Sequence, residues 1–348
     1  MGRPLPAIIL GLASLAVASA GCTTYVESGP ALQAYYRTGF PARDVSDALE
    51  NAVASVVRVF VSRSYETYLF AEEEAPTDAQ MRAPGSDIRG FATDTVSSRE
   101  GTASTGIVIA SRPSVLTILT TDHGVSFPDT VINYFAQGAD AGEVSPMIER
   151  ITIKTRQENT VTGARYVDPF EILARDPARD LALIGVVFEE EVHPGNRPPS
   201  RLVAGDPGRL SFGSLVYVIG YPAGFEMVTQ GIVSNRGPGS NDAFLLDGLW
   251  NEGMSGAAIL AVRGETEALE WVGIARAAAA RTEERLVAPE EAEVGQDPFA
   301  PYDGPVYLQP VQEIRYGVTF SVTMTEIRQF LAEHRSRLSS LGYPLPAL

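Results

Sequence analysis

The sequence predicts an all-β fold of two antiparallel β-barrels followed by a C-terminal helix. Short strand-like runs recur along most of the chain with turns between them, as is typical of barrels. The 32 glycines and 24 prolines supply the turns that many short strands need. A polar, proline-rich stretch divides the strand-like runs into two series, and this favours two barrels over one.

The N-terminal segment is expected to be an export signal. Arg3 precedes an apolar run that is too short to cross a membrane as a helix, and small residues follow it. Residues 1–21 are therefore predicted to be a signal peptide of the lipoprotein type, and residues 22–43 a tether. The end of the signal resembles a bacterial lipobox in which Cys22, the only cysteine, would carry the lipid. Ordinary cleavage after Ala20 is the alternative.

Lipidation of Cys22 would anchor the protein on the periplasmic side of a bacterial envelope. Thr23, in place of an aspartate, favours the outer membrane. A single cysteine leaves no internal disulfide, so stability is expected to come from packing. The net charge of −16 argues against nucleic acid as a partner, because its phosphates would be repelled.

Residues 44–188 are expected to form the N-terminal barrel. Apolar residues at helical spacing predict a short helix over residues 44–57, leading into a first strand. Residues 71–100, rich in Glu, Pro, Asp, Ser and Gly, are predicted to be a long loop or an insertion. The strands are expected at residues 56–61, 105–110, 115–121, 131–135, 149–155, 171–174 and 181–187.

Residues 189–204 are the expected linker, and residues 205–340 the C-terminal barrel. Residues 281–304 carry seven acidic residues and three prolines and are predicted to be an acidic surface insertion. Apolar residues at helical spacing predict a terminal helix over residues 325–341. The strands are expected at residues 215–219, 227–235, 243–246, 257–262, 271–275 and 317–322.

Three motifs, in this order along the chain, offer a histidine, an aspartate and a serine. His123 in TTDHGV follows a strand, Asp180 in RDLALIGV immediately precedes an apolar strand, and Ser255 in GMSG has small neighbours. A serine hydroxyl attacks a carbonyl only when a base takes its proton and a carboxylate orients the base. Each motif alone is ambiguous, but together they predict a catalytic triad. Asp176 is the nearest rival acid, and the proline after it places it in a turn.

With these motifs the chain resembles a trypsin-like serine peptidase of the chymotrypsin fold, and it is most similar to the protease domain of bacterial HtrA (Do/Deg-type) proteins. The resemblance covers roughly residues 50–335 and implies two six-stranded barrels with the active site between them. It does not extend to the PDZ domains of that family. The segments that carry it are TGIVI (105–109), LTTDHGV (119–125), DPARDLALI (176–184), YVIGYPAGFEMVTQGIVS (217–234), NEGMSGAAIL (251–260) and VGI (272–274).

The resemblance also implies roles for residues around the triad. The backbone N–H groups of Gly253 and Ser255 would form the oxyanion hole. Leu249 would lie at the base of the primary substrate pocket, with Ile274 and Arg276 near its wall. An apolar Leu249 favours a small or medium apolar substrate side chain, whereas Arg276 could attract an acidic one. This chemistry uses no metal and no cofactor, so none is expected.

The expected function is that of a serine endopeptidase acting on proteins of the cell envelope. Ala257 stands where the family has a second glycine after the serine, and adds a methyl group near the oxyanion turn. This departure keeps open the alternative of a catalytically inactive, peptidase-like binding or scaffold module. A third possibility, an α/β-hydrolase using Ser255, Asp303 and His334, is disfavoured because the residues after Ser255 are typical of a hairpin.

Overall fold

The computed structural model describes residues 35–83, 85–135, 146–162, 167–188, 201–236, 243–248, 251–287 and 307–348, with backbone alone over 277–287 and 307–316. The expected signal peptide, Cys22, Leu249 and most of the expected linker lie outside these residues. No helix in the described part of the chain is long and apolar enough to cross a membrane.

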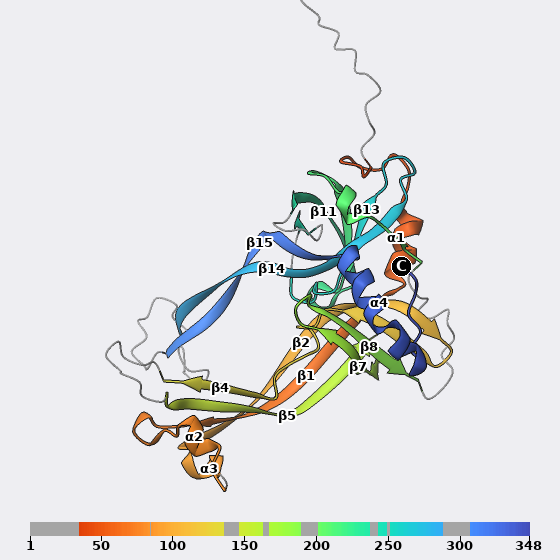
Figure 1. The fold of residues 1–348 in the computed structure, drawn as a ribbon. Helices are drawn as coiled ribbons and strands as arrows, with labels where there is room; N and C mark the ends of the chain where they lie inside the picture. The colour runs from red at the N-terminus through yellow and green to blue at the C-terminus, as the bar shows by residue number, and fades with distance from the viewer. Residues whose placement is uncertain are drawn as a thin grey trace, which may run out of the picture. The chain divides into compact units, whose positions relative to one another are not determined.

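The N-terminal half forms a curled, antiparallel sheet of eight strands (Figure 1). They follow the order β4-β5-β1-β2-β3-β8-β7, and β6 pairs with β5. Among the described strands no pairing joins β7 to β4, so this sheet is a half-barrel. The bounds are β1 Val56–Leu69, β2 Asp94–Arg112, β3 Val115–Thr120, β4 Thr130–Tyr134, β5 Ile148–Thr162, β6 Val167–Pro169, β7 Glu171–Asp176 and β8 Leu181–Val187.

The C-terminal half contains a closed barrel of six strands. These pair in the order β13-β10-β11-β12-β15-β14, and a pairing of β13 with β14 closes the ring. A short β9 pairs in parallel with β14. The bounds are β9 Val203–Ala204, β10 Leu215–Gly220, β11 Met227–Arg236, β12 Phe244–Asp247, β13 Ala258–Val262, β14 Leu269–Val287 and β15 Tyr307–Thr323.

The predicted chymotrypsin-like double barrel with a C-terminal helix is confirmed, with one difference. Six strands were expected in each barrel, and the second has six. The first sheet has eight described strands and stays open. Its extra length lies in β1, β2 and β5, which run for 14, 19 and 15 residues.

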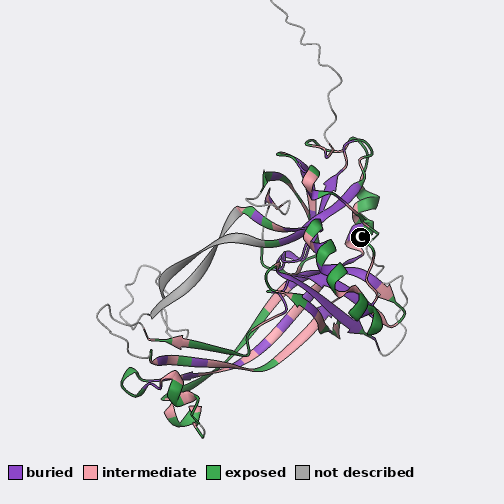
Figure 2. Cartoon of the chain, in the orientation of Figure 1, coloured by how far each residue is buried: buried purple, intermediate pink, exposed green. Residues whose placement is uncertain are grey.

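The far ends of these long strands support a small separate core. Burial alternates along β1, because successive side chains of a strand face opposite sides of the sheet (Figure 2). On the buried side, Tyr68 and Phe70 pack with Ile148 and Ile151. The short helices α2 (Asp78–Met81) and α3 (Ile88–Phe91) lie at this end (Figure 1). The long loop predicted over residues 71–100 is therefore wrong in part: this stretch also holds the 3₁₀ turn η1 (Glu72–Glu74) and the start of β2.

Part of the predicted tether belongs to the folded body instead. Tyr36 is only 1% exposed and forms a β-bridge with Arg263. Its hydroxyl donates to Glu270 at 2.8 Å and accepts a hydrogen bond from the N–H of Asp206 at 2.9 Å. Because these contacts tie the segment to the closed barrel, the tether prediction is wrong for residues 35–43. The partners are distant in sequence, and no periodic pattern in the segment signals the contacts.

The predicted acidic insertion begins as a strand. Residues 281–287 continue β14 and pair with the start of β15, while residues 288–304 lie outside the described part. The expected linker likewise ends in β9.

Two helices frame the barrels. The helix predicted over residues 44–57 is α1, Ser46–Val53. The predicted terminal helix is confirmed as α4, Met324–Ser340, which opens with a capping box between Thr323 and Glu326. One buried cluster contains residues of both sheets and the apolar face of α4, so the helix covers the seam where the two halves meet. Two further 3₁₀ turns are η3, Pro207–Arg209, and η4, Pro222–Gly224.

Candidate active site

The three predicted triad residues meet at the ends of three strands. His123 follows β3 and Asp180 precedes β8, and the antiparallel pairing of Thr120 with Ala182 brings these two strand ends together. Ser255 lies in the turn before β13. The Nδ1 atom of His123 is 2.8 Å from Oδ2 of Asp180, and its Nε2 atom is 2.8 Å from Oγ of Ser255.

These contacts select one tautomer of the imidazole. An ionised carboxylate can only accept, so Nδ1 of His123 carries the proton and Nε2 is left as an acceptor for the hydroxyl of Ser255. The backbone N–H of His123 donates to Oδ1 of Asp180 at 3.0 Å, which fixes the carboxylate at two points. Asp180 is 6% exposed and Ser255 9%, while the side chain of His123 is 46% exposed. The arrangement suits proton transfer from the hydroxyl to the imidazole.

Two other acids near the site are held by arginines. Asp122, next to His123, accepts two bonds from the guanidinium of Arg175, at 2.6 and 3.2 Å. This hydrogen bond raises the pKa of Arg175. Asp176 caps its own turn by accepting from the N–H groups of Ala178 and Arg179, in agreement with the turn predicted for it. Neither acid is bonded to the imidazole.

Two residues expected near the wall of the substrate pocket, Ile274 and Arg276, differ in burial. Ile274 is fully buried in the core. Arg276 donates from Nε to Oδ2 of Asp180 at 3.3 Å, so it shares an oxygen with His123. Its backbone carbonyl lies 3.4 Å from Oγ of Ser255. The guanidinium of Arg276 therefore lies beside the carboxylate of Asp180, and the Arg276 side chain is 45% exposed.

The turn of residues 252–256, which contains Ser255, holds its peptide groups in fixed directions. The carbonyl of Glu252 accepts from the N–H of Ala223 at 2.8 Å, and the carbonyl of Met254 accepts from the N–H of Ala257 at 2.9 Å. In a trans peptide the N–H points opposite to the carbonyl, so the N–H groups of the next residues, Gly253 and Ser255, point away from these partners. Within the described residues neither N–H donates to another group of the chain.

Two glycines are required by the shape of this turn. Gly253 has φ +98°, and a Cβ there would come 2.1 Å from the carbonyl oxygen of Tyr221. Gly256 has φ +87°, and a Cβ there would come 2.0 Å from the carbonyl oxygen of Thr105. Both values lie in the left-handed region that L side chains rarely adopt. The GMSG motif therefore reflects backbone geometry.

Two residues that contact this turn carry no signal of that role in the sequence. Thr105 and Ala223 lie only in segments that resemble the family. In the structure, Thr105 of β2 is fully buried and bonds to Gly253 and Ser255, and Ala223 of η4 bonds to Glu252. No local pattern marks such contacts, because the partners lie far apart in the chain.

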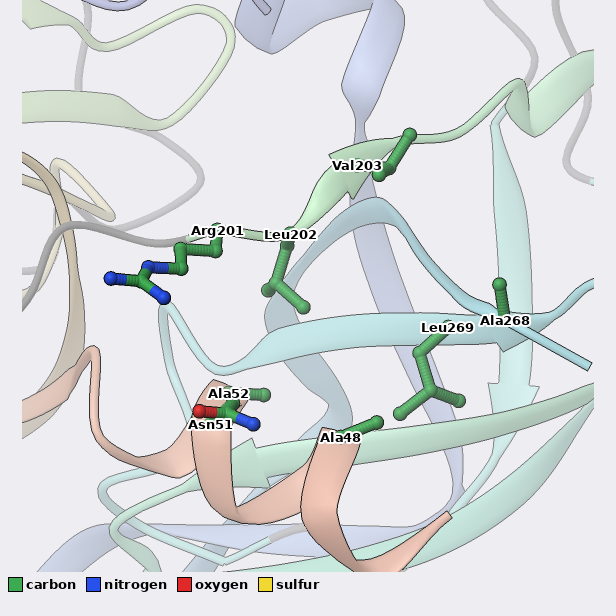
Figure 3. Close-up of a pocket in the computed structure, with 8 residues that line it drawn as sticks. All are labelled: Ala48, Asn51, Ala52, Arg201, Leu202, Val203, Ala268 and Leu269. Carbon is green, nitrogen blue, oxygen red and sulfur yellow. The ribbon is translucent and has the colours of Figure 1, made fainter. Parts of the chain in front are cut away.

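A cavity of about 340 Å³ lies elsewhere on the molecule (Figure 3). His123, Asp180 and Ser255 do not line this cavity. Its lining residues are Ala48, Asn51, Ala52, Arg201, Leu202, Val203, Ala268 and Leu269.

No cluster of His, Cys, Asp and Glu in the described part of the chain has the composition of a metal site.

The chain is similar to a known peptidase family in sequence and to a solved peptidase in structure. Residues 104–274 match a family model described as a trypsin-like peptidase domain. No curated protein matches the chain in sequence. Among solved structures, the chain is similar to one described as the HtrA-type protease AlgW with tripeptide, at 14% identity and a TM-score of 0.44. The similarity covers 86% of this chain and 65% of the other, so the chain spans less than two thirds of that protein's length.

Proposed function

We propose that the protein is a serine endopeptidase, on the premise that residues 104–274 match the model of a trypsin-like peptidase domain. Ser255 is the nucleophile, His123 the general base and Asp180 the carboxylate that orients the base. The observation that carries the proposal is the pair of 2.8 Å contacts that link the carboxylate, imidazole and hydroxyl in series.

In the proposed mechanism, Oγ of Ser255 attacks the carbonyl carbon of the scissile peptide bond while Nε2 of His123 takes its proton. Asp180 stabilises the imidazolium that forms and is not itself protonated. The N–H groups of Gly253 and Ser255 donate to the negative oxygen of the tetrahedral intermediate; each such donor contributes about 3 kcal/mol. His123 then protonates the leaving amine as the peptide C–N bond breaks. In the second half, His123 takes a proton from the water that attacks the acyl carbon, and returns it to Oγ of Ser255 as the ester bond breaks.

The substrates we propose are peptide segments of proteins in a bacterial envelope. Leu249, which lies outside the described residues, would set the primary pocket, with Ile274 and Arg276 near its wall. The N-terminal sequence supports export, with either a lipid anchor on Cys22 or release after Ala20. Fractionation of cells that express the full chain tests the anchor: Cys22→Ser is expected to move the protein from the membrane fraction to the soluble periplasm.

Labelling by an alkyl fluorophosphonate tests the proposed nucleophile. The wild-type protein is expected to form one covalent adduct at Ser255 and to degrade labelled casein, whereas Ser255→Ala is expected to do neither. Ser98→Ala, at an exposed serine of β2, is the matched control and is expected to behave like the wild type. Thermal melting should show that Ser255→Ala remains folded.

The inactive-module alternative predicts a different result. It predicts a folded wild-type protein that forms no adduct at any pH and degrades no casein, yet retains peptides. That outcome would remove the enzymatic proposal and leave the fold intact.

A further inference from the structure

We propose that Thr105 is a positioning residue. Its hydroxyl holds the turn of residues 252–256, which carries the proposed oxyanion donors, in its active shape. The inference rests on the proposed peptidase function and adds a residue from the other half of the molecule to that site. Thr105 lies on β2 of the half-barrel, whereas the turn that it contacts precedes β13 of the closed barrel.

Thr105 uses every polar atom that it has. Its hydroxyl donates to the carbonyl of Gly253 at 2.6 Å and accepts from the N–H of Tyr221 at 3.0 Å. Its backbone N–H donates to the carbonyl of Ser255 at 2.7 Å, and its carbonyl accepts from the hydroxyl of Thr120 at 2.8 Å. The residue is fully buried, so water does not compete for these bonds.

The hydroxyl joins two segments that must stay in register. Tyr221 begins the turn that contains Ala223, and the N–H of Ala223 holds the carbonyl of Glu252. The peptide group between Glu252 and Gly253 carries one of the two proposed oxyanion donors. The hydroxyl oxygen of Thr105 thus links η4, which holds the Glu252 carbonyl, to Gly253, whose N–H is the proposed donor.

All four successive carbonyls from Glu252 to Ser255 are held in place. Those of Glu252 and Met254 bond to backbone N–H groups, and those of Gly253 and Ser255 bond to Thr105. Without the hydroxyl, the carbonyl of Gly253 and the N–H of Tyr221 would both lose a buried partner. The η4 turn would then lose its tie to Gly253 through Tyr221, so the Glu252–Gly253 peptide that Ala223 holds could shift and turn its N–H away from the developing negative charge.

The test compares Thr105→Val, which removes the hydroxyl at nearly constant shape, with Thr105→Ser, which retains it. The measured quantities are the limiting rate and the half-saturation concentration for labelling of the full chain by an alkyl fluorophosphonate, whose phosphoryl oxygen needs the same donors. Thr105→Val is expected to lower the limiting rate about 10- to 100-fold, less than the outright loss of a donor costs. The half-saturation concentration should change less than about threefold.

Thr117→Val is the matched control for burying a valine in place of a threonine. Thr117 lies on the adjacent strand β3, is equally buried, and has a hydroxyl that finds no hydrogen-bond partner among the described residues. Its variant is expected to be labelled at the wild-type rate. Thr105→Ser is expected to recover most of the rate that Thr105→Val loses, which a purely packing role of the methyl group would not produce.

The outcomes test the proposed peptidase function and the positioning role of Thr105 separately. No labelling of the wild type would refute the peptidase function itself. Equal limiting rates for the wild type and a folded Thr105→Val would refute the positioning role alone, as would equal rates for Thr105→Val and Thr105→Ser. Should Thr105→Val not fold, Thr105→Ala compared with Thr105→Ser under the same criterion replaces it.

Discussion

At the residue scale, Ala257 is the position that kept two predictions open, an active peptidase and a catalytically inactive relative. In the structure its side chain is fully buried in the core of the closed barrel. A Cβ added at Gly220 would lie only 2.8 Å from the Cβ of Ala257, so the methyl group occupies space that Gly220 leaves empty. The extra methyl is therefore accommodated by a glycine on the neighbouring strand.

Replacing Ala257 with glycine should consequently cost stability and not restore any missing activity. A small cavity and a more flexible backbone are expected to lower the free energy of unfolding by about 1 kcal/mol. The rate of fluorophosphonate labelling is expected to change less than about threefold, or under about 0.7 kcal/mol of barrier. Ala261→Gly, equally buried on β13 but away from the turn of residues 252–256, should show a similar loss of stability. A large rise in rate confined to Ala257→Gly would contradict this account.

The triad candidates could be named from the sequence because each sits in a short segment with its own local constraint. His123 follows a strand end, Asp180 opens a strand, and Ser255 lies between glycines that the backbone requires. Thr105 could not be named this way, since its hydroxyl bonds to a carbonyl 148 positions along the chain. The ion pair of Arg175 with Asp122 was missed for the same reason.

At the scale of elements, the 3₁₀ turn η4 holds the turn of residues 252–256 through a backbone hydrogen bond, and the backbone of η4 is strained. Ala223 has φ +50° and ψ +24°, in the left-handed region that costs an L residue about 1–2 kcal/mol. Its N–H nevertheless bonds to the carbonyl of Glu252, and the side chain of Arg58 lies beside the next residue, Gly224. The strain is a candidate for relief by mutation.

Ala223→Gly is therefore expected to stabilise the protein by about 0.5–1 kcal/mol, because glycine adopts positive φ without the steric cost of a Cβ. Urea denaturation followed by tryptophan fluorescence measures the change. Ala178→Gly, at an exposed turn residue whose own φ is not positive, is the control and should destabilise slightly. Equal destabilisation by both substitutions would show that Ala223 is not strained.

Elements with a buried apolar face were predictable, and those held by pairing alone were not. The helix α4 shows its apolar face in the spacing of Ile327, Phe330, Leu331 and Leu338, all buried. Residues 281–287 were assigned to an insertion because their acidic composition carries no strand signal. Cross-strand hydrogen bonding to β15 needs no apolar pattern, so composition could not reveal the extension of β14.

At the scale of the whole molecule, the residues after α4 return to the half-barrel and help to join the two halves. Tyr343 is 6% exposed and packs on Gly185 of β8, where an added Cβ would come 2.5 Å from a carbon of its ring. The hydroxyl of Tyr343 donates to a carboxylate oxygen of Glu171 on β7. Arg179, which precedes β8, also pairs with Glu333 of α4 at 2.9 Å.

This junction should make stability depend on alkaline pH. Burial, and then the hydrogen bond to Glu171, raise the pKa of Tyr343 to about 12, whereas an unfolded tyrosine ionises near pH 10. Below about pH 9 both states keep the proton, so this group contributes no pH dependence. Between about pH 10 and 12 the unfolded state releases the proton more readily, so the free energy of unfolding falls as pH rises.

Urea midpoints measured from pH 8 to 11 for the wild type and Tyr343→Phe test this linkage. Tyr343→Phe is expected to lose about 1 kcal/mol at pH 8, where the hydrogen bond is intact in the wild type. The difference should shrink as pH rises above 10, because only the wild type then has a phenol to keep neutral. Glu171→Gln keeps an acceptor without the negative charge and is expected to weaken the alkaline slope. A wild-type minus Tyr343→Phe difference that stays constant from pH 8 to 11 would mean that the C-terminal segment does not hold this tyrosine against the half-barrel.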